Sequence, residues 1–341
     1  MPTMPKRLFA TFLSLILTLC LSAQDSTNFP TLGQIKQHHP DLAKLIDHNT
    51  PIQVITSGYV WTEGPAWNKE GQFLVFSEIP SNTVYKWVEG EGAGKWFSPS
   101  GYTGVTDYGR EPGSNGLMFD PEGRLISCEH GDRRVSMMLK NGGKKTLADN
   151  YDGKRFNSPN DVTRASNGNY YFTDPPYGLP DRFTDPRREM DYCGVYLLRP
   201  SGEVVLLTKE IERPNGIALS PDEKTLYVAQ SHSEQPTITA FPIKSDGTVG
   251  KGKVLYNASE LQGPGIKGNP DGLKVDKHGN LWASGPGGIM VLNSKGDLLG
   301  HIQTGEQTSN CAFGGPDGSI LYITADTYVL RVQTKVQGMG F

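Results

Sequence analysis

Short runs of apolar residues alternate with polar turns along most of the chain, and one arrangement of the two recurs. Each copy has a polar residue, a short apolar run, a turn and a second apolar run, which predicts a β-hairpin. A third apolar run, and usually a fourth, follows each hairpin, so the repeated unit contains four short strands. The six copies begin at Glu63, Asn115, Asn160, Asn215, Asp271 and Asn310.

The period of this repeat indicates the fold. Successive copies start 52, 45, 55, 56 and 39 residues apart, and a period of roughly 40–50 residues with four strands is typical of a β-propeller. We therefore predict an all-β protein, a six-bladed β-propeller of four-stranded blades over residues 51–341. A β-sandwich is the structural alternative, but it would not need the same polar residue at the same place in every repeat.

The two ends of the propeller are predicted to pair. The last unit has a hairpin and a third strand at 328–332, but no convincing fourth strand follows it. The apolar run at 52–57 lies before the first repeat and is available to supply that strand. Pairing of the N- and C-terminal strands would close the ring and remove two exposed sheet edges.

The first 50 residues follow a different pattern. Two basic residues precede the apolar run 8–21, which ends in small residues and is too short for a stable membrane span. We therefore interpret residues 1–23 as a signal peptide and predict a periplasmic or secreted protein, with a lipoprotein anchor on Cys20 as the alternative. In residues 24–50 a partial helical period is interrupted by Pro40, which predicts a short helical lead-in on the outside of the domain.

Composition narrows the choice of partners. The chain has 341 residues and a formal net charge of -3, without a strongly basic stretch after the signal peptide, so nucleic-acid binding has no electrostatic support. The remaining cysteines, Cys128, Cys193 and Cys311, are odd in number and scattered, which does not indicate a disulfide framework. We interpret them as small buried hydrophobic residues. We expect a monomer or a weak homodimer.

The first polar residues of the six copies are the candidate site. The first strand of each blade lines the central channel of a propeller, so these residues would converge at the channel mouth. All of them carry a side-chain oxygen and none carries a sulfur or an imidazole, and such a set suits one divalent metal, Ca²⁺ first, with Mg²⁺, Mn²⁺ and Zn²⁺ as alternatives. The alternative interpretation is structural, because Asn-Gly and Asp-Gly are common turn pairs.

Three insertions interrupt the repeats at Ser98–Ser114, Asp174–Tyr192 and Gln262–Pro270. We expect them to cluster near one or other face, where they could shape a pocket or a lid. Glu129 and His130 come just after the second inner strand of unit two, as Asp174 does in unit three. We expect these strands to run away from the axial residues, which places their ends on the opposite face unless an insertion brings one over the site.

Four segments carry a resemblance to a known family. They are WTEGPAW at 61–67, SPNDV at 158–162, RPNGIA at 213–218 and NPDGL at 269–273. Together they resemble the gluconolactonase/regucalcin-like six-bladed propellers over about residues 50–333. The resemblance implies that the glutamate, two asparagines and the aspartate hold one divalent metal at the channel mouth. In this chain they are Glu63, Asn160, Asn215 and Asp271, and the resemblance implies that Asp271 also accepts the proton of the attacking water.

Other residues are candidates for substrate contact. Asn115 and Asn310 fill the two remaining axial positions, and His130 could carry a proton near neutral pH. The family has an Arg-Phe-Asn-Asp run whose arginine meets substrate. Arg155 begins a similar run, but three residues separate Arg155-Phe156 from Asn160-Asp161.

The resemblance, together with the ring of axial oxygens, implies that the protein hydrolyses a sugar lactone. A metal ion would polarise the lactone carbonyl and stabilise the oxyanion formed when water attacks. Two alternatives remain open at this point: a non-catalytic propeller that binds Ca²⁺ or a sugar, and an esterase or phosphotriesterase on the same metal site. Hydrolysis by a Ser-His-Asp triad is not supported, because the chain has no Gly-x-Ser-x-Gly segment.

Overall fold

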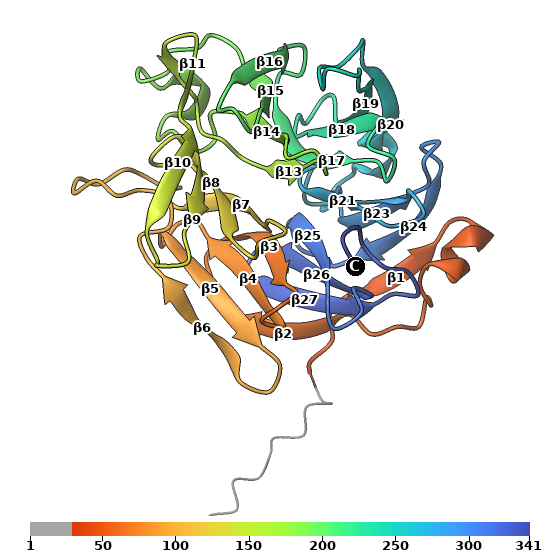
Figure 1. Ribbon diagram of the computed structural model, residues 1–341. Coiled ribbons are helices and arrows are strands. Elements are labelled where there is room, and N and C mark those ends of the chain that lie inside the picture. Colours follow the sequence, from red (N-terminus) through yellow and green to blue (C-terminus); the bar gives the residue numbers. More distant parts are fainter. Residues whose placement is uncertain (1–28) are drawn as a thin grey trace, which may run out of the picture.

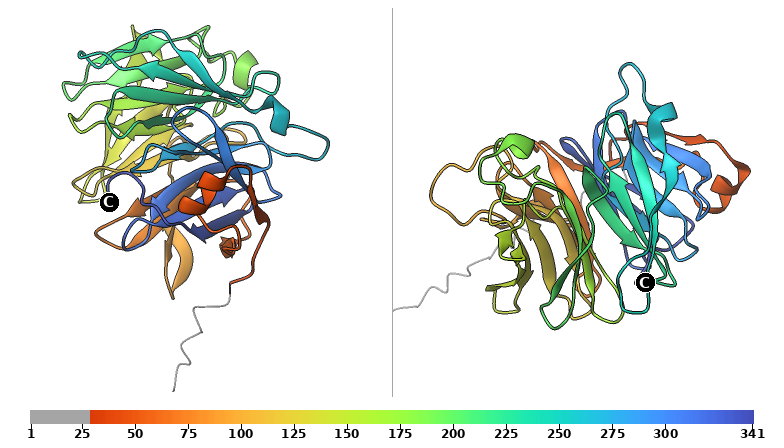
Figure 2. Two further views of the ribbon diagram at one scale, coloured as in Figure 1. Left: turned by 90° about the vertical axis from the view of Figure 1, so that its right-hand side faces the viewer. Right: turned by 90° about the horizontal axis from the view of Figure 1, so that it is seen from above.

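Six antiparallel sheets form a ring in the structure, a computed structural model that describes residues 29–341 (Figure 1). Each sheet contains four blade strands, ordered from an innermost strand at the axis to an outermost strand at the rim, and one sheet gains a fifth strand at its rim. Seen from the side, the strands drawn in yellow and those drawn in teal lie in opposite halves of the ring (Figure 2). The prediction of an all-β, six-bladed propeller with four-stranded blades is confirmed.

The strands of the blades follow the predicted apolar runs. Blade one has β3 (Thr62–Asn68), β4 (Phe73–Glu78), β5 (Thr83–Val88) and β6 (Gly92–Phe97), and blade two has β7 (Ser114–Phe119), β8 (Leu125–Glu129), β9 (Arg134–Met138) and β10 (Lys144–Ala148). Blade three has β13 (Val162–Arg164), β14 (Tyr170–Asp174), β15 (Gly194–Leu198) and β16 (Val204–Thr208), and blade four has β17 (Pro214–Leu219), β18 (Thr225–Gln230), β19 (Thr237–Pro242) and β20 (Lys253–Asn257). Blade five has β21 (Leu273–Val275), β22 (Leu281–Gly285), β23 (Gly288–Leu292) and β24 (Leu298–Gln303), and blade six has β25 (Thr308–Gly314), β26 (Ile320–Ala325), β27 (Tyr328–Gln333) and β2 (Gln53–Ser57).

Strand β2 closes the ring. It pairs antiparallel with β27, with Gln53 opposite Arg331 and Ser57 opposite Tyr328. Blade six is therefore built from both ends of the propeller domain, as predicted. The pairing covers an edge of β27 that would otherwise be exposed.

The N-terminal lead-in lies against the rim of blades five and six. Strand β1 (Gln34–Gln37) adds a fifth strand to blade five beside β24, and a 3-10 helix η1 (Pro40–Lys44) follows it. Leu42 and Ile46 are fully buried against these blades, which fixes the segment on the domain. The signal-peptide interpretation of residues 1–23 and the alternative of an anchor on Cys20 lie outside the described residues.

Large side chains fill the spaces between blades. Trp87, Trp282 and Tyr196 are among the largest fully buried residues.

Within residues 29–341, no helix is long and apolar enough to cross a membrane. Cys128, Cys193 and Cys311 are buried and free, which confirms that they serve as small core residues.

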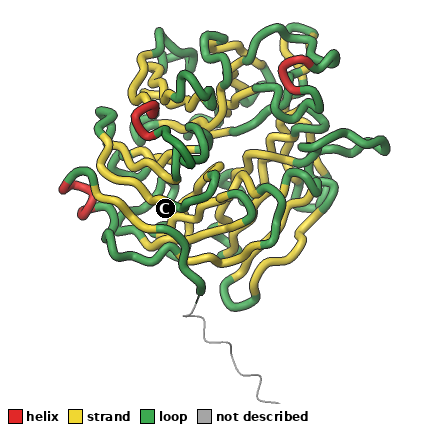
Figure 3. The backbone as a smooth tube through the Cα atoms, turned by 180° about the vertical axis from the view of Figure 1, so that it is seen from behind, coloured by secondary structure: helices red, strands yellow, loops and turns green. Residues whose placement is uncertain are grey.

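A few further elements lie in the connections. The small hairpin β11 (Asn150–Tyr151) and β12 (Lys154–Arg155) follows blade two, η2 (Arg182–Thr184) lies in the second insertion, and η3 (Ala258–Leu261) precedes the third. The helical segments are short pieces at the periphery (Figure 3).

Candidate active site

The axial residues project from the beginnings of the innermost strands. Glu63, Asn115 and Asn215 are the second residues of β3, β7 and β17, and the ladder of each hairpin is irregular directly after them. Such bulges re-aim a side chain at the start of a strand. Asn115 and Asn215 are therefore strand residues, and the interpretation of their Asn-Gly pairs as turns is wrong.

The glycines that follow these residues hold the blades together at the axis. The N–H of Gly116 donates to the carbonyl of Asn160 (2.7 Å), and that of Gly216 donates to the carbonyl of Asp271 (3.1 Å). Gly64 has a φ of 48°, and a Cβ there would overlap the carbonyl oxygen of Asn115. These positions require glycine because neighbouring backbones approach closely. The close approach places the axial side chains at the same height along the propeller axis.

Several oxygens at this level have no hydrogen-bond partner. They are buried, and they comprise Oδ1 of Asn115, Oδ1 of Asn160, Oδ1 of Asp271 and Oδ2 of Asp161, the last of which forms a long ion pair with Lys274 Nζ at 3.8 Å. Leaving a buried polar atom unsatisfied costs about 1–3 kcal/mol, so a cluster of them requires an explanation. The oxygens of Asn115, Asn160 and Asp271, which have no donor, are a set that a hard cation would satisfy.

The buried negative charges of the site also favour a bound cation. Burial raises the pKa of Glu63 to about 8 and raises that of Asp271 well above its usual range. The negative charges of Asp161 and Glu111 raise both pKa values further, and the charge of Glu63 also raises the pKa of Asp271. Like charges held together away from water favour either protonation or a neutralising cation. Within residues 29–341, no three His, Cys, Asp or Glu side chains form a metal-binding group. A cation at the axis would therefore depend on amide oxygens as well as on the two carboxylates.

A cavity of about 770 Å³ opens above the axial residues. Its size is in the range of small-molecule sites. Its floor includes Glu63, Asn115, Asn160, Asn215 and Asp271. All three insertions contribute to its walls, through Gly109, Arg110 and Glu111 from the first, Tyr177 and Arg182 from the second, and Asn269 from the third. The prediction that the insertions gather near one face and shape a pocket is confirmed.

Asn310, the sixth axial residue, does not line this cavity. Its Nδ2 donates to Glu63 Oε2 (3.4 Å), while its Oδ1 accepts from the backbone of Cys311 (2.9 Å) and from Lys274 Nζ (3.4 Å). The side chain of Asn310 therefore orients Glu63 from the side, and its predicted contact with substrate stays a prediction.

Arg155 and His130 are not among the cavity-lining residues. Arg155 lies in β12 and is exposed, and its Nη2 donates to the carbonyl of Asp132 (2.7 Å). His130 is fully buried behind the pocket wall, with Nδ1 3.6 Å from Glu111 Oε2. Burial lowers the pKa of His130 to about 3, so the ring is neutral at pH 7.

The expected direction of the second strands was wrong. Strand β8 is antiparallel to β7 and returns to the axial level, where Glu129 pairs with Ser114, the neighbour of Asn115. Glu129 and His130 are therefore on the face of the axial residues. Asp174 also lies on the face of the axial residues. Its carboxylate accepts a hydrogen bond from the backbone N–H of Ser158 (2.8 Å), which is close to Asn160.

Sequence reasoning missed three residues of the cavity wall: Glu111, Tyr177 and Arg182. Burial raises the pKa of Glu111, and Tyr177 donates a long hydrogen bond to the carbonyl of Ser231 (3.4 Å). All three lie in insertions, which have no counterpart in the other copies of the repeat, so their positions could not be predicted by alignment of the copies. The one signal available was the concentration of charged and aromatic residues in segments that enter or leave an innermost hairpin.

Comparison with known proteins agrees with this geometry. Residues 61–327 match the model of the SMP-30/Gluconolactonase/LRE-like region. The chain is 41% identical over 323 residues to a gluconolactonase from Zymomonas mobilis, covering 93% of this chain and 90% of that protein. A gluconolactonase structure from Xanthomonas campestris superposes with a TM-score of 0.76 at 32% identity, covering 89% of this chain and 97% of that one.

A more distant structure shares the fold alone. It is the calcium-binding protein regucalcin from Agrobacterium tumefaciens, with a TM-score of 0.64 at 18% identity, covering 91% of this chain and 96% of that one. The family match spans most of the propeller and includes the segments that carry Glu63, Asn160, Asn215 and Asp271. The chain belongs to the SMP-30/gluconolactonase/LRE-like family.

Proposed function

We propose that this protein is a metal-dependent hydrolase that opens a sugar lactone. The observation that carries the proposal is the layer of buried, unpartnered oxygens at the floor of a cavity large enough for a monosaccharide lactone. The relationship to gluconolactonases over nearly the whole chain supports a lactonase.

The residues present fit a divalent cation. Glu63, Asn160, Asn215 and Asp271 would hold it, and their two carboxylates would balance its charge. When bound, such an ion polarises the lactone carbonyl and stabilises the oxyanion that forms on attack by water. The oxygen-only set favours Ca²⁺, with Mg²⁺, Mn²⁺ and Zn²⁺ as alternatives.

Asp271 is the residue that we assign to proton transfer. It borders the cavity, and its Oδ1 has no hydrogen-bond partner in the protein. As the water oxygen bonds to the carbonyl carbon, one water proton passes to Asp271. The ring C–O bond then breaks, and the proton passes to the released alkoxide, so the product is a hydroxy acid.

The test uses the purified mature protein and gluconolactone, with acid release followed in a weakly buffered indicator assay. Treatment with EDTA should abolish the catalysed rate above spontaneous hydrolysis, and separate additions of Ca²⁺, Mg²⁺, Mn²⁺ and Zn²⁺ should identify the ion that restores it. Asp271→Asn should lower kcat by at least about a hundredfold, whereas Asp297→Asn, an exposed aspartate of blade five, should not. Full activity after exhaustive chelation would refute the metal requirement. Binding of gluconolactone without turnover would instead favour a non-catalytic propeller.

We also propose that the chain is exported. The basic residues, apolar run and small residues of 1–23 support cleavage near Ala23. N-terminal sequencing of the protein from a periplasmic extract should give a start near Gln24. A membrane-bound form carrying lipid on Cys20 would contradict this proposal.

A further inference from the structure

An ion pair joins two insertions across the wall of the cavity. Arg182 in the second insertion donates from Nη2 to Oε1 of Glu111 in the first, at 3.0 Å. Both residues line the cavity above the axial oxygens. The other carboxylate oxygen, Oε2, faces Nδ1 of the buried His130 at 3.6 Å.

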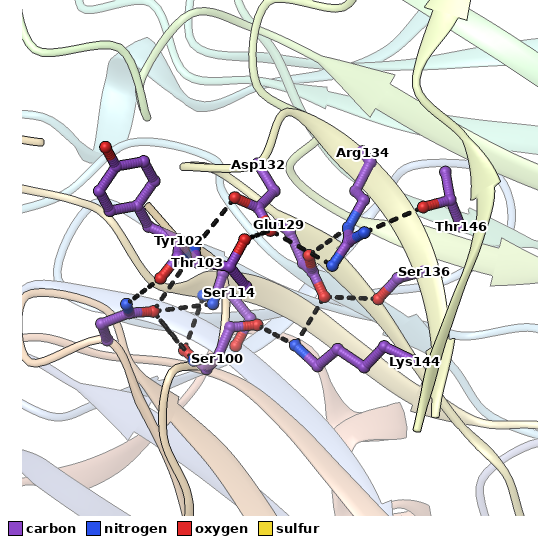
Figure 4. A network of polar contacts seen from close by, with 12 residues as sticks. Ser100, Tyr102, Thr103, Ser114, Glu129, Asp132, Arg134, Ser136, Lys144 and Thr146 are labelled. Atoms are coloured by element: carbon purple, nitrogen blue, oxygen red, sulfur yellow. Dashed lines mark hydrogen bonds and ion pairs between the residues drawn. The ribbon is translucent and has the colours of Figure 1, made fainter. Parts of the chain in front are cut away.

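The insertion that carries Glu111 is anchored beside that residue and at its start. The N–H of Gly131 donates to the carbonyl of Pro112, the neighbour of Glu111, at 3.2 Å. The backbone N–H groups of Ser100 and Gly101 donate to Asn82 Oδ1 at 2.9 and 2.7 Å, and Lys144 donates to the carbonyl of Ser100 at 2.6 Å. Lys144 also pairs with the buried Glu129 at 2.7 Å, so that the start of the first insertion is tied to blade two (Figure 4).

The guanidinium of the pair comes from a residue with an unusual backbone. Arg182 has a φ of 49°, in the left-handed region that residues with a side chain rarely adopt. That conformation is strained for a residue with a Cβ, and such strain concentrates at functional sites. The side chain of Arg182 is 51% exposed and borders the cavity, so N–H groups that Glu111 does not use are available to a ligand.

We propose that Glu111 and Arg182 form the subsite that binds the hydroxyl groups of the lactone and so selects polyhydroxylated lactones over unsubstituted ones. This inference rests on the proposed lactonase function. A carboxylate accepts hydrogen bonds from sugar hydroxyls, and a guanidinium donates to their oxygens. Both kinds of bond are charge-assisted and therefore strong. A site built to bond substrate hydroxyls discriminates strongly against an analogue that lacks them.

The test compares kcat/KM for gluconolactone with kcat/KM for δ-valerolactone, which has the same ring size and no hydroxyls. In Glu111→Gln and in Arg182→Met, the ratio of the two values should fall by roughly tenfold or more relative to the parent protein. The loss should be expressed mainly as a higher KM for gluconolactone, and Arg182→Lys should recover part of it.

The chain offers a matched control. Lys267 in the third insertion pairs with Glu306 at 2.7 Å, with side-chain exposures of 51% and 25% against 51% and 20% for Arg182 and Glu111. Neither residue of the control pair lines the cavity. Lys267→Met should leave the selectivity ratio unchanged, and thermal melting of all variants reports whether folding is intact.

Two outcomes would overturn the inference. If folded Arg182→Met loses activity equally on both lactones, the ion pair only fastens the insertions together. If it keeps the parent's kcat/KM on both lactones, the hydroxyls are bound elsewhere. Failure of the proposed function itself looks different, because the parent protein would then hydrolyse neither lactone.

Discussion

Replacement of Glu129 by alanine should destabilise the domain by about 3 kcal/mol. The Glu129 carboxylate is fully buried, and three side chains donate to it: Arg134 Nε at 2.6 Å, Ser136 Oγ at 2.6 Å and Lys144 Nζ at 2.7 Å (Figure 4). Removing one partner of a buried ion pair costs about 3–5 kcal/mol, because the other charge is left without compensation.

The lower end of that range applies because the two cations keep other partners. Arg134 stays 3.2 Å from an Asp132 carboxylate oxygen, and Lys144 keeps its bond to the carbonyl of Ser100 at 2.6 Å. Glu129→Gln keeps the shape and one acceptor oxygen, so its cost should be smaller, about 1–2 kcal/mol.

The assay is urea unfolding followed by tryptophan fluorescence, together with gluconolactone kinetics. Glu122→Ala is the control, because Glu122 belongs to the same blade and pairs with Arg124 at 2.9 Å but is 53% exposed; it should cost at most about 1 kcal/mol. KM for gluconolactone should also rise in Glu129→Ala, since Lys144, which holds the start of the first insertion through the carbonyl of Ser100, loses the carboxylate that positions its ammonium group. A free energy of unfolding for Glu129→Ala within 1 kcal/mol of the Glu122→Ala value would refute the reasoning about the buried carboxylate.

Three further predictions concern the axis, the pocket wall and the ring closure. Gly64→Ala should abolish most activity and lower the melting temperature, because the added Cβ would overlap the carbonyl of Asn115; wild-type melting and kinetics would contradict this. The pKa of His130 lies at about 3 in the fold against 6.5 for an ordinary histidine, so the unfolded chain binds the proton first. Stability should therefore fall as pH drops from about 6.5 towards 3, and urea unfolding of His130→Gln should show a shallower pH dependence. A chain that begins at residue 59 lacks β2 and leaves β27 with a free edge. It should elute as aggregates in size-exclusion chromatography, and a stable monomer would argue against ring closure by β2.

The repeat was sufficient to predict the blades, the closure of the ring and the position of the axial residues. The blades follow from the local alternation of apolar and polar residues. The axial residues follow from the polar residue that stands at the same position in each copy. Glu63 and Asp271 could therefore be placed at one level before any contact was known. The antiparallel geometry of a hairpin was also available, and neglecting it put Glu129 on the wrong face.

The pocket wall could not be predicted in the same way. Glu111 and Arg182 are 71 residues apart in sequence, and they meet because two insertions fold over the same mouth. Neither insertion has an equivalent in the other repeats. The sequence therefore could not predict in which direction the side chains of Glu111 and Arg182 point. Arg155 illustrates the same limit, because its local motif resembles the family while its β12 hairpin directs the guanidinium to Asp132.

There is a physical reason why the repeats supply the axial residues while the insertions supply the wall of the cavity. The axial positions must present oxygens at one level, and a closed ring of identical hairpins does this with little freedom. Amides at most of these positions present oxygen atoms without charge, so the blades can assemble around only two axial carboxylates, with Asp161 adjacent. A ring of six carboxylates would repel itself strongly in a buried environment. Selectivity among lactones requires groups placed to the side of this layer, and the insertions can vary there without disturbing the closure of the propeller.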